Sequence, residues 1–175
     1  MKILIAERDP HFRRMLEHML MNWQYDAITA TNAPEVLALL ATEHAPDIAL
    51  LDSAMPAVDG FQLCRNIREG SSPAANTYII MLLRRSITIR DVFAASLDAG
   101  ADDYICKPFD PEELRARLRV GAREIALRRN LSARESELEA TTIRVKELQE
   151  LFLERTAAAE TDRNAMAAQA GLAMR

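Results

Sequence analysis

The sequence predicts an α/β domain with a doubly wound, five-stranded parallel sheet, followed by one long C-terminal helix. Three observations predict this class. Short apolar segments alternate with helical stretches through residues 1–110, several of these segments are apolar at every position, and a seven-residue repeat runs through the last third of the chain. Strands that are apolar throughout are typical of a sheet covered on both faces. Strands that alternate with helices require right-handed crossovers, which produce the doubly wound arrangement.

The size and composition of the chain fit one globular domain with an appendage. Its 175 residues are 49% hydrophobic and carry a formal net charge of −4, so a single core can form and direct nucleic-acid binding is not expected. No run of about 18 apolar residues occurs, and the N-terminal segment reaches charged residues too early for a signal peptide. We therefore expect a soluble, cytoplasmic protein without a membrane segment. Cys64 and Cys106 are expected to be reduced structural thiols.

Each predicted element rests on a local signal. The strands are short apolar runs, and helices begin where proline suits a first helical turn or where a loop ends. The pair Asp9–Pro10 places a capping carboxylate directly before a helix-starting proline. The predicted strands cover residues 2–6, 25–30, 47–51, 78–82 and 104–106, and the predicted helices begin at Pro10, Pro34, Gly60 and Asp91.

Polar residues follow several predicted strands at the point where each strand ends. Glu7 and Arg8 follow the first strand, Asp52 follows the third and Lys107 follows the fifth. Because ligands of doubly wound domains gather at the carboxyl ends of the strands, we expect these residues to converge in one crevice. Such a crevice suits a divalent cation beside a phosphoryl group, since Mg²⁺ prefers oxygen ligands and an ammonium can pair with phosphate.

At this crevice Arg8 stands where a cation could otherwise bind. A cluster of carboxylates without compensating charge is costly, and a guanidinium can pair with two carboxylate oxygens without a metal. We therefore expect an Arg8–Asp52 or Arg8–Glu7 ion pair, in which Arg8 substitutes for the cation. A solvated surface arginine is the alternative interpretation. Asp9 could also reach a metal, but its place before a helix-starting proline favours capping.

Four segments resemble the receiver domain of bacterial two-component response regulators, and the resemblance covers residues 1–120. The segments read KILIAERDP, PDIALLDSAMPAVDGFQLCRNIR, YIIML and AGADDYICKPFDPEEL. The resemblance implies a flavodoxin-like fold and a regulatory module without enzymatic activity of its own. It also implies a partner, either a sensor histidine kinase or another signalling protein.

The resemblance assigns phosphorylation chemistry to the residues at the strand ends. It implies that Asp52 is the phosphoacceptor and that Lys107 contacts the phosphoryl group. It further implies that Mg²⁺ is held by Glu7, Asp52 and the backbone carbonyl of Ala54. The family carries two adjacent acids after the first strand, whereas this chain has Arg8 at the second of these positions. Mg²⁺ binding is therefore expected to be weak or absent.

The switch positions also depart from the family pattern. The resemblance makes Tyr104 the aromatic switch on the fifth strand and Pro108 a cis-proline. After the fourth strand the family carries Thr or Ser, whose hydroxyl couples the phosphoryl group to the aromatic switch, and this chain has Leu83 there. The loss of a metal ligand and of the coupling hydroxyl favours a degenerate receiver. A conventional receiver, switched by phosphorylation of Asp52, is the alternative.

The last third of the sequence predicts a long helix, with residues 121–175 forming a segment distinct from the receiver. Asp110 and Pro111 supply a cap and a first-turn proline, and no proline follows them. Apolar residues then recur at a strict interval of seven, which is typical of a coiled coil. The seam consists of Leu131, Leu138, Val145, Phe152, Ala159, Met166 and Ala173.

This helix predicts a parallel homodimer, but a weaker one than an ideal zipper. Leu127 and Leu148 fit the second seam position, whereas Arg134 and Thr141 do not. A single helix folded back on the receiver is the alternative. The tail offers no DNA-recognition module. By family resemblance, a receiver followed by such a helix often leads to an enzymatic output, such as a diguanylate cyclase or a phosphatase, which would lie beyond Arg175.

Overall fold

The protein contains a five-stranded parallel sheet, as the sequence predicts. The computed structural model describes residues 1–42, 44–56, 58–70, 76–84 and 89–172. The sheet has the strand order β2-β1-β3-β4-β5, and every pair of neighbouring strands is parallel. The strands are β1 (Lys2–Ala6), β2 (Asp26–Ala30), β3 (Ile48–Asp52), β4 (Tyr78–Arg84) and β5 (Asp103–Lys107).

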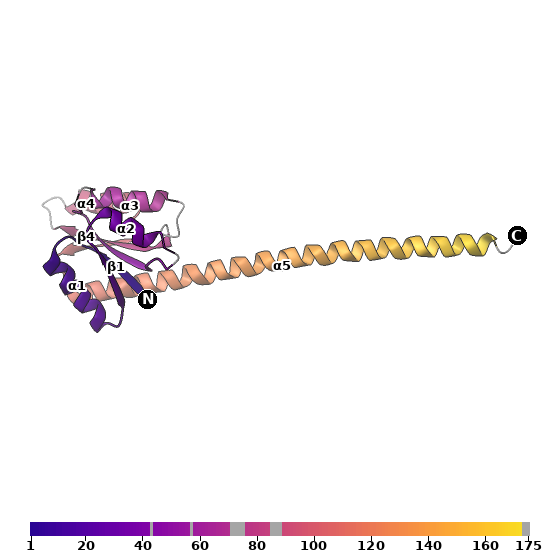
Figure 1. Ribbon diagram of the computed structural model, residues 1–175, viewed down its shortest axis with the longest axis horizontal. Coiled ribbons are helices and arrows are strands. Elements are labelled where there is room, and N and C mark those ends of the chain that lie inside the picture. The colour runs from indigo at the N-terminus through magenta and orange to yellow at the C-terminus, as the bar shows by residue number, and fades with distance from the viewer. Residues whose placement is uncertain (43, 57, 71–75, 85–88, 173–175) are drawn as a thin grey trace. The chain divides into compact units, whose positions relative to one another are not determined.

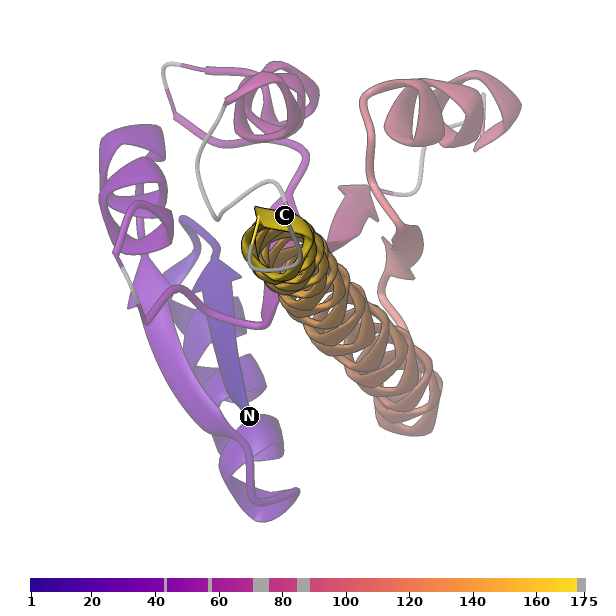
Figure 2. The same cartoon turned by 90° about the vertical axis from the view of Figure 1, so that its right-hand side faces the viewer.

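Helices cover both faces of this sheet, which confirms the doubly wound arrangement. Figure 1 shows α1 and the first turns of α5 on one face and α2 and α3 on the other, and the turned view in Figure 2 shows α2 and α3 again on a common side. The helices are α1 (Pro10–Asn22), α2 (Ala33–Leu40), α3 (Gly60–Glu69), α4 (Ile89–Asp98) and α5 (Pro111–Leu172).

Two hydrophobic clusters fill the space between the sheet and its helices. On one face Leu63 of α3 is fully buried, and on the other Leu16 of α1 and Leu114 of α5 are fully buried. Every residue of β3 is buried, which explains why the sequence shows a continuous apolar run there. Both cysteines are free thiols, and burial raises the pKa of Cys64 to about 11.

The start of α1 has the cap that the sequence predicts. The Asp9 carboxylate accepts hydrogen bonds from the backbone N–H groups of His11 (2.8 Å) and Phe12 (3.2 Å). These hydrogen bonds, first the one from Phe12, lower the pKa of Asp9. Asp9 therefore satisfies backbone donors that the first helical turn would otherwise leave without partners.

A guanidinium holds together the end of the sheet where β4 and β5 begin. Arg68 of α3 donates from Nε to the Gly100 carbonyl (2.7 Å) and from Nη1 to the Thr77 carbonyl (2.8 Å). Its Nη2 pairs with the Asp102 carboxylate at 2.5 Å, and the same carboxylate accepts the Ile79 backbone N–H. One arginine thus joins α3 to the segments that lead into two strands.

The chain divides into two compact units, Met1–Ala126 and Leu127–Arg175, and the boundary between them falls within helix α5. Within the first unit, Ile125 is still buried and Gly121 lies against the ring of Tyr78. The packing of the first unit therefore extends a little past residue 120. No helix of the described residues is long and apolar enough to span a membrane.

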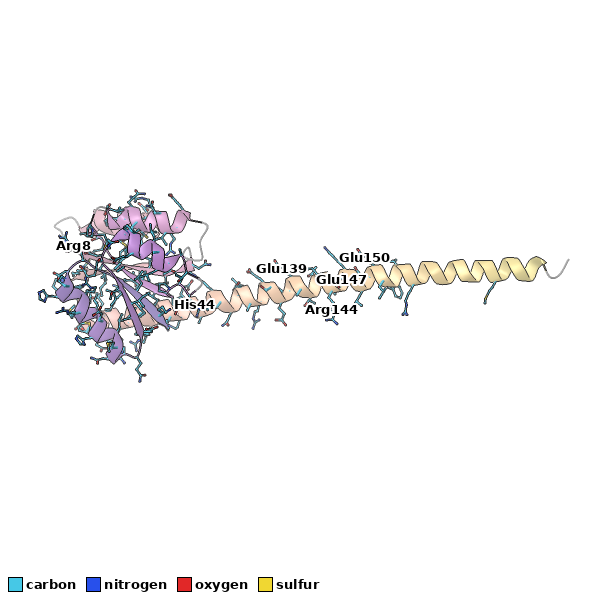
Figure 3. All side chains as sticks on the ribbon, in the orientation of Figure 1. Arg8, His44, Glu139, Arg144, Glu147 and Glu150 are labelled. Atoms are coloured by element: carbon cyan, nitrogen blue, oxygen red, sulfur yellow. The ribbon has the colours of Figure 1, made fainter. Side chains whose placement is uncertain are left out.

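The second unit exposes an apolar stripe along the predicted seam. The side chains of Leu131, Leu138, Val145 and Phe152 are 60%, 67%, 47% and 67% exposed. Figure 3 shows charged side chains, among them Glu139 and Arg144, projecting from the same helix. The side chains of Ala159 and Ala173 lie outside the described residues, whereas Met166 is exposed. The stripe is the surface on which the dimer prediction depends.

Candidate functional site

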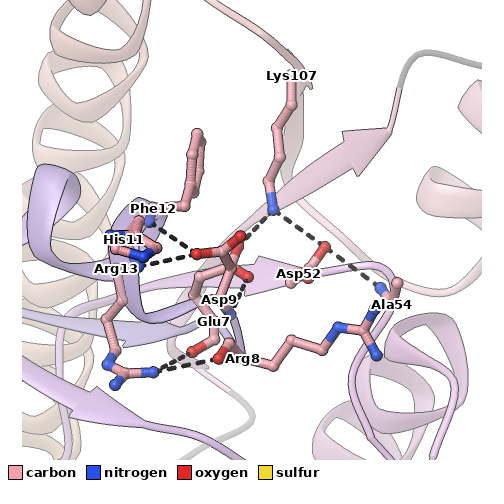
Figure 4. A network of polar contacts seen from close by, with 9 residues as sticks. All are labelled: Glu7, Arg8, Asp9, His11, Phe12, Arg13, Asp52, Ala54 and Lys107. Atoms are coloured by element: carbon pink, nitrogen blue, oxygen red, sulfur yellow. Dashed lines mark hydrogen bonds and ion pairs between the residues drawn. The ribbon is translucent and has the colours of Figure 1, made fainter.

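Three charged side chains meet where the carboxyl ends of the strands converge. Glu7 follows β1, Asp52 ends β3 and Lys107 ends β5. Both carboxylates are 1% exposed, and the lysine side chain is 16% exposed. The Lys107 ammonium contacts the Glu7 carboxylate and lies 3.2 Å from Oδ1 of Asp52 (Figure 4). We call these three residues the acidic corner. The sequence predicts that all three lie in one crevice, and the structure brings them together.

Local hydrogen bonds fix both carboxylates of the acidic corner. The Glu7 N–H donates to the Ala30 carbonyl (3.2 Å), which extends the pairing of β1 with β2. Oε1 of Glu7 accepts the backbone N–H of Asp9 (2.9 Å), and Oδ1 of Asp52 accepts that of Ala54 (3.3 Å). The carboxylates are therefore held by backbone N–H groups of two turns as well as by the Lys107 ammonium.

Arg8 does not form the ion pair that the sequence predicts. Among the described residues, the ion-pair partner of both Glu7 and Asp52 is Lys107. Arg8 is exposed, and in Figure 4 its side chain runs toward Ala54. The physical reason is that the Lys107 ammonium already lies between the two carboxylates, so the Arg8 guanidinium extends past them toward the Ala54 turn (Figure 4). The expectation of an Arg8–Asp52 or Arg8–Glu7 pair is therefore wrong in this structure.

The two residues expected at the switch positions, Leu83 and Tyr104, lie on the neighbouring strands β4 and β5. The sequence predicts that Leu83 follows the fourth strand, but β4 continues to Arg84 and includes Leu83. The backbone of Leu83 is in register with Cys106 of β5. The Leu83 side chain is 2% exposed. Tyr104 is half-buried, with the Arg117 guanidinium 5.5 Å from the centre of its ring. The position at which the family resemblance leads one to expect a hydroxyl thus holds a buried apolar side chain.

Two aromatic rings beside Lys107 were not identified from the sequence. The ammonium lies 4.5 Å from the centre of the Phe12 ring, and the Phe12 and Phe109 rings meet edge to face at 5.7 Å. Phe109 follows Pro108, and the peptide bond between Lys107 and Pro108 is cis. On an amphipathic helix, Phe12 has the pattern of an ordinary core residue. The sequence therefore carries no separate signal for its contact with a cation.

Gly60, where the sequence predicts the start of a helix, touches the backbone that carries Asp52. Its N–H donates to the Ser53 carbonyl (3.1 Å). A Cβ atom at this position would lie 2.3 Å from the Asp52 carbonyl oxygen and 2.7 Å from the Ser53 Cα. Both neighbours are backbone atoms, so α3 could not accept a larger residue here without moving the Asp52 turn.

We expect Gly60→Ala to lower the free energy of unfolding by about 1–3 kcal/mol, because overpacking against backbone atoms forces a shift. Gly70→Ala is the matched control, since Gly70 is exposed with a φ of −70° that alanine adopts freely. Urea denaturation of both variants measures the difference. Equal midpoints for the two variants would show that the close approach at Gly60 has no energetic weight.

Comparison with known proteins gives one consistent family. Residues 3–119 match the response regulator receiver domain. The response regulator ArlR of Staphylococcus aureus is 41% identical over 119 residues, which cover 68% of this chain and 51% of that protein. The probable transcriptional regulator ycf27 of Porphyridium aerugineum is 39% identical over 124 residues, which cover 71% of this chain and 49% of that protein. The chain thus spans about half the length of these curated relatives.

A solved structure shares the same fold. It is the receiver domain of the sensor histidine kinase PA1611 from Pseudomonas aeruginosa PAO1, described with a magnesium ion coordinated in its active site cleft. It is 26% identical, has a TM-score of 0.60, and aligns over 71% of this chain and 97% of its own. The residues that match the receiver family, 3–119, include the acidic corner and all of the sheet except Lys2. This chain belongs to the response regulator receiver domain family of two-component signalling.

Proposed function

We propose that this receiver domain is degenerate at its phosphorylation site and acts as a regulatory dimerisation module. One observation carries the proposal: the Lys107 ammonium bridges the two buried carboxylates of the acidic corner, Glu7 and Asp52. The carboxylates already have a cation between them that belongs to the chain. Arg8 and Leu83, at the positions of a second acid and of a hydroxyl, support the same interpretation.

The donor set of the acidic corner does not fit Mg²⁺ well. Mg²⁺ demands near-octahedral oxygen coordination, and proteins usually bind it through carboxylates. Here both carboxylates contact the same ammonium, and the next residue after Glu7 is a second cation, Arg8. A metal ion would have to displace Lys107 from Asp52 and approach a guanidinium. That exchange costs electrostatic free energy, which an additional carboxylate would offset.

The readout of a phosphoryl group is weakened as well. Leu83 is buried beside β5 and offers no hydroxyl that could follow a group on Asp52. Tyr104 instead lies near Arg117 of α5, which is paired with Asp103 at 2.6 Å and with Glu113 at 2.9 Å. These contacts tie the aromatic residue to α5 independently of Asp52. We therefore propose that signalling passes through partner binding and dimerisation.

The exposed stripe on α5 supports the dimerisation half of the proposal. Leu131, Leu138, Val145 and Phe152 are separated by seven residues each and are about half exposed or more. Burying one such side chain against a second copy contributes about 1.5–3 kcal/mol. A two-stranded coiled coil covers a stripe with this repeat, and the parallel arrangement places identical seam residues opposite each other.

A conventional phosphorylation switch is the second candidate. It is favoured by the presence of Asp52 and Lys107 at 3.2 Å on an intact receiver fold. In that case a sensor histidine kinase would phosphorylate Asp52, and an output domain such as a diguanylate cyclase or a phosphatase would follow Arg175. The curated relatives are about twice as long as the matched segment, which is compatible with an output of some kind.

Wild-type protein treated with a small-molecule phosphodonor and Mg²⁺ distinguishes the two candidates. The degenerate receiver predicts little or no added phosphate by intact mass and weak Mg²⁺ binding by calorimetry. Asp52→Asn is the control, because any mass that it still gains is not on Asp52. Stoichiometric phosphorylation of the wild type that disappears in Asp52→Asn would refute degeneracy and establish the conventional switch.

A further inference from the structure

The Lys107 ammonium has an aromatic partner in addition to its two carboxylates. It contacts Glu7, lies 3.2 Å from Asp52, and lies 4.5 Å from the centre of the Phe12 ring. A cation within about 6 Å of a ring centre is attracted by the negative face of the ring, and the attraction is stronger where water is excluded. Because the lysine side chain is only 16% exposed, this site meets that condition.

The position of the Phe12 ring is fixed from two sides. Its backbone N–H donates to the Asp9 carboxylate that caps α1, so the first helical turn fixes the backbone position of Phe12. Its ring packs against Phe109 at an interplanar angle of 81°, and both rings contact the cluster between the sheet and α5. The cap and the neighbouring ring therefore present a pre-set aromatic face to the ammonium.

We propose that Phe12 is a positioning residue, which holds the Lys107 ammonium on Glu7 and Asp52 through the face of its ring. The ring attracts the cation without competing for its hydrogen bonds, since it offers no acceptor to replace a carboxylate. It also shields the ion pairs from water, which strengthens them. An aliphatic side chain of similar size would shield the pairs but would not attract the cation.

The positioning role rests on the proposed function in one respect. If the acidic corner is closed by its own lysine, Phe12 is part of what keeps it closed. The contact itself can be tested without metal or phosphate. The chain has only three lysines, Lys2, Lys107 and Lys146, so the ammonium signal of each can be assigned by single substitution. Lys2 and Lys146 then serve as internal references, because Lys146 is exposed and the Lys2 ammonium donates to the His44 carbonyl at an exposed position.

The experiment measures hydrogen exchange of the Lys107 ammonium by NMR in the full chain. We expect Phe12→Leu to accelerate exchange at Lys107 by roughly tenfold, while Phe12→Tyr, which keeps the ring, stays close to wild type. Phe12→Met is a second non-aromatic variant, whose unbranched side chain covers the case in which leucine packs poorly at this position. Phe61→Leu is the matched control, because Phe61 is a half-buried ring on α3 that packs in the other cluster.

Two results would overturn the proposal. Unchanged Lys107 exchange in folded Phe12→Leu and Phe12→Met would show that the ring does not hold the ammonium. Equal acceleration in Phe12→Tyr and Phe12→Leu would show that side-chain shape matters and the ring face does not. Neither result bears on degeneracy, which is decided by the wild-type phosphorylation assay, and a phosphorylated wild type would leave the Phe12 result unaffected.

Discussion

A chain that ends after Arg129 is expected to be a folded monomer, whereas the full chain is expected to be a dimer. The truncation removes every seam residue from Leu131 onward and keeps Ile125, which is buried in the first compact unit. Each lost seam contact is worth on the order of 2 kcal/mol per buried side chain, so the loss of several abolishes association at micromolar concentration. Light scattering measures the mass, and circular dichroism reports whether the receiver is still folded.

Point substitutions test the same interface without shortening the chain. Leu138→Glu and Val145→Glu should weaken the dimer, because each places a charge in the seam. Ile143→Glu is the matched control, since Ile143 is 58% exposed on the same helix but lies outside the seam. A truncated protein with the mass of a dimer would place the interface on the receiver itself. Equal weakening by all three substitutions would show that the seam is not the contact.

Replacing Arg8 by aspartate is expected to restore metal binding at the acidic corner. The substitution supplies a second carboxylate after β1 and removes a cation, so Mg²⁺ affinity should rise by on the order of tenfold, or about 1.4 kcal/mol. Adding Leu83→Thr should restore a hydroxyl beside the phosphoryl position. The double variant should therefore take phosphate and change conformation more fully than either single variant. Calorimetry with Mg²⁺ and intact mass after treatment with a phosphodonor measure the two effects.

The control for this experiment is a charge change elsewhere on the same surface. Arg14→Asp alters the net charge by the same amount, and Arg14 is exposed on α1. It should not tighten Mg²⁺ binding to the same extent. If wild type and Arg8→Asp bind Mg²⁺ equally well, Arg8 is a solvated neighbour of the site and has no part in excluding the metal.

The sequence was sufficient to predict the sheet because burial dictates its pattern. A strand covered on both faces has to be apolar throughout, and β3 and β4 show this directly. The Asp9 cap was predictable for a similar reason, since capping depends only on neighbouring residues. The ends of strands are less well determined: β4 continues through Leu83 to Arg84, where pairing with β5 continues although the apolar run has ended.

The identity of the cation at the acidic corner could not be read from the sequence. Arg8 and Lys107 both follow strands whose ends converge, and either charge could balance two carboxylates. The packing of β5 decides between them, because it brings the Lys107 ammonium between Glu7 and Asp52. The role of Phe12 could not be predicted for a related reason, because its contact with Lys107 joins α1 to the end of β5. Contacts between residues so distant in sequence leave no local pattern.

The chemistry of the two cations gives the opposite ends of the sheet different capacities for rearrangement. Before β4 and β5, Arg68 directs a planar, forked group at two carbonyls and a carboxylate, a geometry that only one orientation satisfies. At the other end, the ammonium of Lys107 has three rotatable donors on a flexible stem and can exchange partners while keeping its charge paired. The Arg68 end of the sheet therefore admits one arrangement of its contacts, whereas at the acidic corner the ammonium can shift between Glu7 and Asp52 without leaving its own charge unpaired.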